Sequence, residues 1–291
     1  MPQSVETLHK IAALINFSGK LNIVDIGANP IGGPPPYASL IAANLANLIG
    51  FEPQKEAYEA LIKADTPNEK YLPYAVGDGK KHKLNIYKGS GLTSLFRIRR
   101  NTIDAIRGLR ASSRLVAEET IDTKKLDSLK EVQSIDFLKI DIQGGELAVF
   151  ENGTKKLKDA LAIQTEVAFS PLYEDQPMFG DVDVFLRSIG FMFHRFAHVA
   201  HFPLGRLLFK GKWRKPMHHT LDGDVVYTRD FSDPAAMSDI ALTKLALLAH
   251  ACFQSYDLAA LCISNLEARG TLAKGAVQSY ADILPDEYTL G

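Results

Sequence analysis

The sequence predicts a doubly wound α/β fold, with helices on both faces of a mostly parallel sheet. Three observations support this class. Over roughly the first 190 residues, short apolar runs alternate with segments of helical periodicity. The first apolar run, LNIVDIGANP, ends in an acid, a glycine and an asparagine, as a parallel strand does where it leads into a nucleotide-binding loop. With 291 residues, 46% of them hydrophobic and 23% charged, the chain can bury a large core.

The first strand and the loop after it indicate the kind of ligand. The apolar residues of 21–26 can be buried on both faces of a sheet, while Gly27 and Asn29 tolerate positive φ and let backbone N–H groups approach a ligand. Asp25 would supply a fixed acceptor. Asn29 and Pro30 stand where a dinucleotide fingerprint has its second glycine and the residue after it. The loop therefore suits a ligand that has a nucleoside but no phosphate, such as S-adenosylmethionine.

The alternation continues as far as residue 89. Prolines before residue 37 suit the start of a helix, Glu52 and Pro53 close the second strand, and Gly77 and Gly79 mark a turn after the third. The segment 90–114 is less regular and is rich in arginine and serine. The elements expected here are a helix at 37–46, a strand at 47–53, a helix at 54–64, a strand at 69–79 and an extra strand or hairpin arm at 83–89.

The second half of the sheet shows stronger signals, because its apolar runs are bounded by glycines. Gly153 and Gly190 each end a short helix. From Pro234 onward alanine and leucine recur at helical spacing with no further strand signal, which predicts one large domain at 1–232 and a helical appendage at 233–291. The elements expected before that point are strands at 135–144, 160–169, 191–199 and 224–230, and helices at 145–153 and 179–190.

Five acids fall at or near the ends of the predicted strands. In an open parallel sheet the ligand crevice lies outside the carboxyl ends of the strands, so these side chains are expected to meet there. Glu52 lies 25 positions after Gly27, about where a βαβ unit has the acid that binds a ribose diol. Each acid taken singly can also be a turn residue or a helix cap. The five are Asp25, Glu52, Asp78, Asp141 and Glu166.

The order of the motifs resembles the FkbM family of S-adenosylmethionine-dependent methyltransferases. The stretches that carry the resemblance are VDIGAN, GFEP, YLPYAVGDG, TSLF, TKKLDSL, FLKIDIQGGELAVFENG and QTEVAFSPLYEDQPMFGDVDVFLRSIGF, collinear from about Asn22 to Asp230. The resemblance implies a class I methyltransferase (Rossmann-like) fold with seven strands, the last antiparallel to the rest. It also implies O-methylation of a sugar, a glycan or a natural product. LKIDIQGGE is similar to the family's LKID-x-x-G-x-E, except that Gln143 stands where many members have an acid.

The resemblance and the topology together imply a cofactor site. Asp25, Gly27 and Asn29 are expected to hold the methionine end of S-adenosylmethionine. We expect Glu52 to bind the ribose, and Asp78 to accept from the adenine amino group.

The same reasoning gives a catalytic set, for in-line methyl transfer with a general base taking the hydroxyl proton. Asp141 is expected beside the methyl group, as the base or as an acceptor for the ammonium of the cofactor. Lys139 would pair with Asp141 and lower its pKa, or form a structural salt bridge. Glu166 would receive a sugar hydroxyl. Glu146 would complement a helix dipole or contact a ligand.

Histidines and basic segments add alternatives. His218 and His219 precede the last strand and offer a base near neutral pH or a polar loop. HRFAHVAH lacks an acid or cysteine to complete a ligand set, so no metal is expected. The basic segment 97–114 and the KGKWRKP stretch around Trp213 would bind a phosphate-bearing substrate, or form solvated faces.

Composition narrows the partners and the location. A net charge of −1 and a pI near 6.7 argue against nucleic acid or an anionic membrane as a partner. Cys252 and Cys262 do not share a helix face, so a reducing cytoplasm is expected, and neither a signal peptide nor a membrane span is indicated. The partner expected is a small-molecule or glycan acceptor.

Two alternatives of other classes remain. One is a Rossmann-type oxidoreductase with a nicotinamide cofactor, which would share the first strand, its loop and the ribose acid. The other is a noncatalytic cofactor-binding module whose helical tail docks to an assembly. The sequence indicates no oligomeric state.

Overall fold

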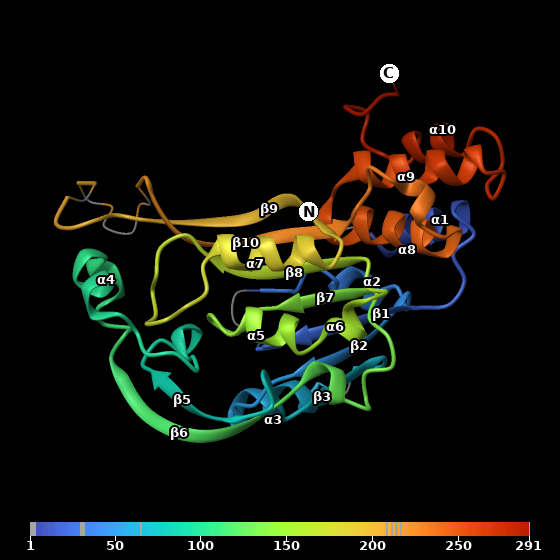
Figure 1. Cartoon of the computed structure of the whole chain (residues 1–291). Helices are drawn as coiled ribbons and strands as arrows, with labels where there is room; N and C mark the ends of the chain where they lie inside the picture. The colour runs from blue at the N-terminus through green and yellow to red at the C-terminus, as the bar shows by residue number, and fades with distance from the viewer. Residues whose placement is uncertain are drawn as a thin grey trace.

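A seven-stranded sheet forms the centre of the molecule (Figure 1). The computed structural model describes residues 4–29, 33–64, 66–207, 209–210, 212, 215 and 217–290. The strand order is β3-β2-β1-β7-β8-β10-β9, with β10 antiparallel to both of its neighbours and the other described pairings parallel. This is the class I methyltransferase fold that the sequence predicts. The strands are β1 (Leu21–Ile26), β2 (Ala46–Phe51), β3 (Glu69–Leu72), β7 (Phe137–Ile140), β8 (Ala162–Ala168), β9 (Phe191–Phe202) and β10 (His219–Arg229).

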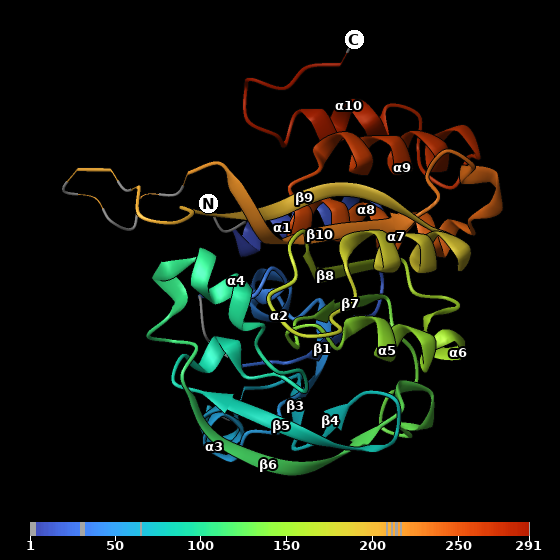
Figure 2. The same ribbon diagram turned by 60° about the vertical axis from the view of Figure 1, so that its left-hand side comes forward.

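One predicted strand is divided between two sheets. Residues 69–79 were expected as a single strand, but β3 ends at Leu72 and β4 (Ala75–Val76) belongs to a second, three-stranded sheet. Pro73 between them lacks a backbone N–H, so it cannot donate to a ladder. The expected hairpin arm is β5 (Lys81–Tyr87), which pairs with β6 (Leu115–Lys124), a strand that the sequence did not predict. Figure 2 shows this small sheet on the side of the molecule opposite α9 and α10.

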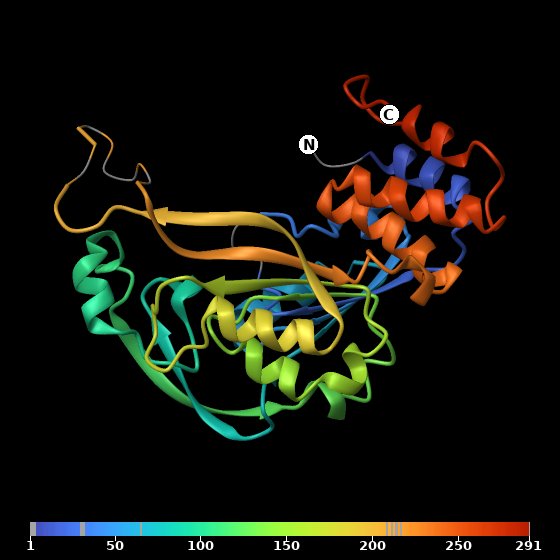
Figure 3. The same ribbon diagram turned by 45° about the horizontal axis from the view of Figure 1, so that its top comes forward.

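Helices cover both faces of the central sheet (Figure 3). On one face the apolar residues of β1, β7 and β8 pack against α5 (Glu146–Glu151), α6 (Thr154–Leu157) and α7 (Phe179–Ser188). The other face packs against α1, α2 and the helices that follow β10. Two of these helices begin at serine caps: Ser4 accepts from Thr7 N and Ser238 from Ala241 N. The helices of this face are α1 (Val5–Leu14), α2 (Ala38–Ala42), α8 (Asp239–Leu248), α9 (Tyr256–Ala268) and α10 (Ala276–Ala281).

The C-terminal helices share one core with the sheet. Leu245 and Ile263 belong to the same apolar cluster as Leu21 of β1 and Leu8 of α1. The segment 233–291 therefore forms a layer of the fold. The domain boundary expected near residue 232 stays a prediction. A π-helical turn, Ala249–Phe253, joins α8 to α9, and both cysteines are free thiols. Among the described helices, none combines the length and apolarity that crossing a bilayer requires.

The carboxyl ends of the parallel strands form one edge of the sheet. Because β10 runs the other way, its first residues reach the same edge, with Asp222 opposite Ala168 at the end of β8. The described part of the loop between β9 and β10 extends beyond this edge, next to α4 (Arg100–Ala105), as Figure 1 shows. The remaining helix, α3 (Lys55–Lys63), follows β2. This edge is where the topology predicts a ligand.

Candidate functional site

A cavity of about 600 Å³ lies at the carboxyl ends of β1, β2 and β7. Its volume is in the range of small-molecule and cofactor sites. The lining includes six of the residues that the sequence predicted, while Asp78 and Glu166 are not part of it. The six are Asp25, Gly27, Asn29, Glu52, Lys139 and Asp141.

Asp25 lines this cavity and is held by two partners. Its side chain is almost fully buried, with a residue exposure of 2%, and it accepts from Tyr37 Oη at 2.6 Å and Lys139 Nζ at 3.2 Å. Burial raises the pKa of Asp25, and Lys139 and Tyr37 oppose this effect. Burial alone would lower the pKa of Lys139, but the Asp25 and Asp141 carboxylates raise it, so the lysine is a cation in this site.

Lys139 was expected to pair with Asp141 or to form a structural salt bridge, and its ion-pair partner is another acid. The described ion pair joins Lys139 to Asp25 rather than to Asp141. The reason is the register of the sheet, in which Asp25 of β1 lies directly opposite Lys139 of β7. Side chains at paired positions of adjacent strands project from the same face, so they meet. The sequence also did not predict the contact of Asp25 with Tyr37, the N-cap residue of α2.

Gly27 allows β1 and β7 to approach each other at their ends. Its φ is 83°, and a Cβ built on it would lie 2.1 Å from the Asp141 carbonyl oxygen. A side chain cannot be accommodated at that distance, so the position requires glycine for both conformation and space. The backbone after β1 is thereby brought against the loop that carries Asp141.

Glu52 presents a buried carboxylate to the cavity. Its residue exposure is 2%, and the described bond to its side chain comes from Gln54 N at 2.7 Å. Burial raises the pKa of Glu52 to about 7, and Asp25 adds to the effect. A buried carboxylate with one protein donor can accept further hydrogen bonds from a ligand.

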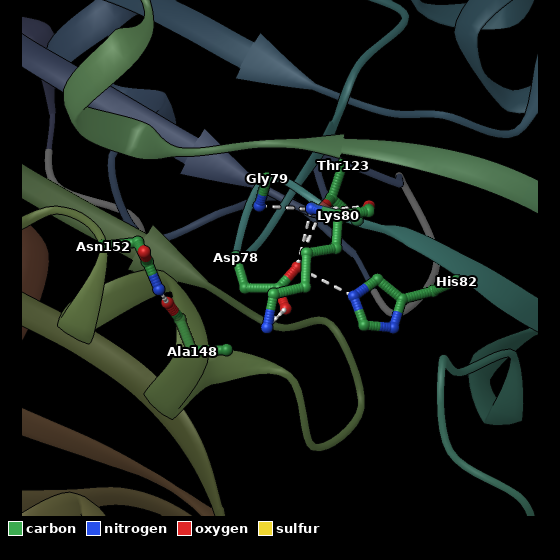
Figure 4. A network of polar contacts seen from close by, with 7 residues as sticks. All are labelled: Asp78, Gly79, Lys80, His82, Thr123, Ala148 and Asn152. Carbon is green, nitrogen blue, oxygen red and sulfur yellow. Dashed lines mark hydrogen bonds and ion pairs between the residues drawn. The ribbon is translucent and has the colours of Figure 1, made fainter.

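Asp78 belongs to a different network, shown in Figure 4. Its Oδ1 accepts from Lys80 N at 2.9 Å and from Thr123 Oγ1 at 3.2 Å, and it lies 2.8 Å from His82 Nε2. Burial would raise the pKa of Asp78, but the hydrogen bonds from His82, Lys80 and Thr123 lower it. The side chain thus stabilises the turn between β4 and β5, and the adenine contact expected for it stays a prediction.

Gln143 joins two of the predicted carboxylates. Its Nε2 donates to Asp141 Oδ1 at 2.9 Å and to Glu166 Oε2 at 2.8 Å, while its Oε1 accepts from Tyr173 Oη at 3.0 Å. The residue adopts a φ of 58° in the turn after β7. An acid in its place would add charge to a group of carboxylates. The amide found here instead bridges two of them.

Glu146 stabilises the loop after β7 by accepting hydrogen bonds from its backbone. Its two carboxylate oxygens accept from Ile142 N at 2.8 Å and from Gly144 N at 2.9 Å. Burial raises the pKa of Glu146 to about 7, although these backbone donors oppose the shift. The Glu146 carboxylate therefore holds the loop 142–144 in place, a role that the helix-dipole interpretation did not include.

The carboxylates at this edge form a dense acidic group. Ligand oxygens of Asp141, Glu146 and Glu166 lie within 4.8 Å of one another. Burial raises the pKa of Glu166 well above its ordinary value, and the Asp141 and Glu146 charges add to this, which favours its protonated form. Gln143 donates to Asp141 and Glu166, and backbone N–H groups donate to Glu146. Because protein donors satisfy these carboxylates in part, their proximity by itself does not assign a metal.

The sequence analysis did not single out two acids of β10 that lie at this edge. Asp224 lines the cavity and pairs in register with Glu166, and Asp222 lies two residues before it. Burial raises the pKa of Asp222 to about 6, and Asp224 and Asp141 contribute. The signal was available, because an antiparallel last strand places its first residues at the carboxyl ends of the others.

The remaining candidates lie apart from the cavity lining. His219 begins β10, opposite Phe202, and His218 is exposed just before it. His194 contacts Ser255 Oγ at 2.6 Å. The prediction for Trp213 lies outside the described residues, as does Pro30.

Comparison with known proteins identifies the domain that contains this site. A family model described as "Methyltransferase FkbM domain" matches residues 25–193. None of the curated proteins with which the sequence was compared matches it.

Solved structures with a similar arrangement include two methyltransferases. Precorrin-6y C5,15-methyltransferase from Geobacter metallireducens is 16% identical, with 77% of this chain and 89% of that chain covered and a TM-score of 0.35. Magnesium protoporphyrin IX methyltransferase from Synechocystis is 11% identical, with 78% and 79% covered and a TM-score of 0.37. At such TM-scores, the assignment rests on the family match and on the strand order of the chain itself.

Proposed function

The chain belongs to the FkbM methyltransferase family, and on that basis we propose that it transfers a methyl group from S-adenosylmethionine to a hydroxyl group of a sugar, glycan or natural product. The observation that carries the proposal is a single cavity whose lining includes a buried acceptor carboxylate, Glu52, and the acid at the end of β7, Asp141. Family membership supports methyl transfer. The choice of a hydroxyl acceptor rests on the carboxylates.

The residues present fit the cofactor. Glu52 has a buried carboxylate with one described protein donor, which matches a ribose diol. The loop 27–29 approaches the ligand space with backbone, since Gly27 has no side chain. Asp25 and Asn29 line the same cavity and are proposed to hold the methionine end. An apolar slot lined by Phe51, Tyr74, Val76, Leu84 and Ile142 adjoins it at Gly27 and Pro53 and is proposed to receive the adenine ring.

The bound cofactor would supply an electrophilic methyl group on a sulfonium. The chain would orient the acceptor and remove its proton. We propose Asp141 as the base, because it lines the cavity and its Oδ1 is held by Gln143. Glu166, whose pKa is raised by burial, is proposed to bind the hydroxyl of an acceptor. Lys139 is proposed to position Asp25 and to balance the charge of Asp141, rather than to react.

The proposal includes a cytoplasmic location. Cys252 and Cys262 are free thiols, as expected in a reducing compartment. The methyl acceptor is proposed to be a small molecule or a glycan rather than nucleic acid, in agreement with the net charge of −1.

Calorimetry and a transfer assay test the function. We expect S-adenosylhomocysteine and S-adenosylmethionine to bind and NAD not to bind, and we expect labelled methyl transfer to at least one member of a panel of sugars and polyketide alcohols. Asp141→Asn should reduce turnover by about a hundredfold or more while cofactor affinity changes by less than about threefold. Asp122→Asn, an exposed acid on β6, is the control.

The outcomes separate the alternatives. Binding of NAD alone would reject the methyltransferase proposal in favour of an oxidoreductase. Cofactor binding without transfer to any acceptor in the panel would favour a noncatalytic module. Unchanged turnover in a folded Asp141→Asn protein would remove Asp141 as the base.

A further inference from the structure

Two basic segments that lie a hundred residues apart in the sequence meet at one end of the molecule. The loop between β9 and β10 contacts the segment containing α4, where Gly205 N donates to Ala105 O at 2.8 Å. Figures 1, 2 and 3 all show the described part of this loop beside α4. We call the described residues of 203–218 the hairpin tip.

The hairpin tip carries positive charge without compensation. From Pro203 to Leu221 the sequence has five basic residues and no acidic one. The described ones, Arg206, Lys210, Lys212 and Lys215, are all exposed. This local charge is not apparent in the net charge of the whole chain, which is −1.

The neighbouring segment extends the same basic surface. Residues 97–114 include six arginines and a single acid, Asp104. Arg110 pairs with Asp104, and Arg97 pairs with Glu118 of β6. Arg99 and Arg100 are exposed and take part in none of the ion pairs found among the described residues.

Large apolar side chains are exposed between the charges of the hairpin tip. Leu207 is 71% exposed, and Leu204 and Phe209 are also exposed. Lys215 Nζ lies 4.0 Å from the centre of the Phe209 ring. Exposed leucine and phenylalanine among lysine and arginine are typical of segments that enter the interface of a bilayer, with the rings and leucines in the acyl boundary and the cations at the headgroups.

We propose that the hairpin tip, together with the α4 segment, binds the surface of an anionic lipid bilayer. The charges complement acidic headgroups, and the bilayer would bury apolar side chains that the fold leaves in water. Nucleic acid would complement the charge equally, but it gives exposed leucines no apolar phase to enter. A bilayer therefore accounts for both properties of the surface.

Such binding would orient the site toward the membrane. The hairpin tip extends beyond the same edge of the sheet at which the cavity opens, the carboxyl ends of the parallel strands. Acceptors carried at a membrane surface would then face the carboxylates of β7 and β8. The binding itself does not depend on the proposed methyl transfer, since it rests on the hairpin tip and the α4 segment.

Vesicle sedimentation tests the proposal with the full chain. Vesicles of phosphatidylcholine with about 30 mol% phosphatidylglycerol should bind the protein at least about tenfold more tightly than vesicles of phosphatidylcholine alone, and about 0.5 M salt should weaken binding. The double variant Lys210→Glu with Lys212→Glu should weaken binding at least about tenfold. Leu207→Ser with Phe209→Ser should also weaken it, by about tenfold, without removing the salt dependence.

Matched controls lie on other parts of the surface. Ile240 of α8 is 71% exposed, as Leu207 is, and Val184 of α7 is 63% exposed, so Ile240→Ser with Val184→Ser removes two exposed apolar side chains away from the hairpin tip. Lys130→Glu with Lys274→Glu reverses two exposed charges elsewhere. Both controls should bind vesicles as the wild type does. Circular dichroism and the binding of S-adenosylhomocysteine verify that each variant is folded.

Three results would overturn the proposal: equal binding to neutral and anionic vesicles, equal loss in the hairpin-tip and control variants, or binding of an RNA duplex without binding of vesicles. Loss of vesicle binding in a hairpin-tip variant that still binds S-adenosylhomocysteine supports it. A failure of methyl transfer with vesicle binding intact would concern the proposed function only.

Discussion

We predict that Glu52 makes the binding of a nucleoside depend on pH. Burial raises the pKa of its carboxyl group to about 7 in the free protein. Ribose hydroxyls that donate to it favour the ionised form, so below that pH a proton must first be removed. About a tenth of the sites are ionised one pH unit below the pKa and about nine tenths one unit above, which gives a tenfold change in affinity, or about 1.4 kcal/mol.

Adenosine is the suitable probe, because it has the ribose diol but lacks the amino acid, whose ammonium would contact other groups. Calorimetry from about pH 6 to about pH 8 should show its dissociation constant falling about tenfold in the wild type. Glu52→Gln should bind more weakly at high pH, by roughly 1 to 3 kcal/mol, and should show no such dependence. Glu69→Gln, which alters another cavity acid, should keep the wild-type profile.

Two results would refute this reasoning. One is a wild-type dissociation constant that does not change with pH, and the other is a pH profile that persists in Glu52→Gln. A nucleoside lacking the 2′-hydroxyl offers a further check, since the pH effect should shrink with the loss of one donor.

Two predictions concern stability. The pKa of Asp78 is lowered by hydrogen bonds from His82, Lys80 and Thr123, so its stabilising contribution is present above about pH 4 and is lost as the pH falls toward the lowered value; Asp78→Asn should make the free energy of unfolding less sensitive to acid in urea titrations. Gly27→Ala should destabilise the protein by about 1–3 kcal/mol more than Gly19→Ala and should abolish cofactor binding. Both glycines have positive φ, but of the two only Gly27 has backbone where a Cβ would lie. Equal melting temperatures of the two variants would exclude that contact.

The alternation of apolar runs and helical segments was enough to predict the sheet. It located the strand that contains Asp25 and the two strands that end just before Glu52 and Asp141. The carboxyl-end rule predicted that these acids share a cavity, as they do. The same rule failed to bring Asp78 into that cavity. Pro73 ends β3 and moves the chain into a second sheet, and the carboxylate is then satisfied by its own turn. β6 was not recognised because most of its residues are exposed, four of the ten are charged and Thr123 is the one buried residue among them, so the segment has no apolar run.

What the sequence determined by itself was the order of the elements, the family and the residue types at the strand ends, because these depend on periodicity and on local turn chemistry. Only the tertiary structure decided which of those residues meet. Strand register paired Lys139 with Asp25, the reversed direction of β10 added Asp224, and a left-handed turn placed Gln143 between two carboxylates. The physical reason is that such contacts join strands and turns far apart in the chain, whose alignment is set by packing across the whole sheet.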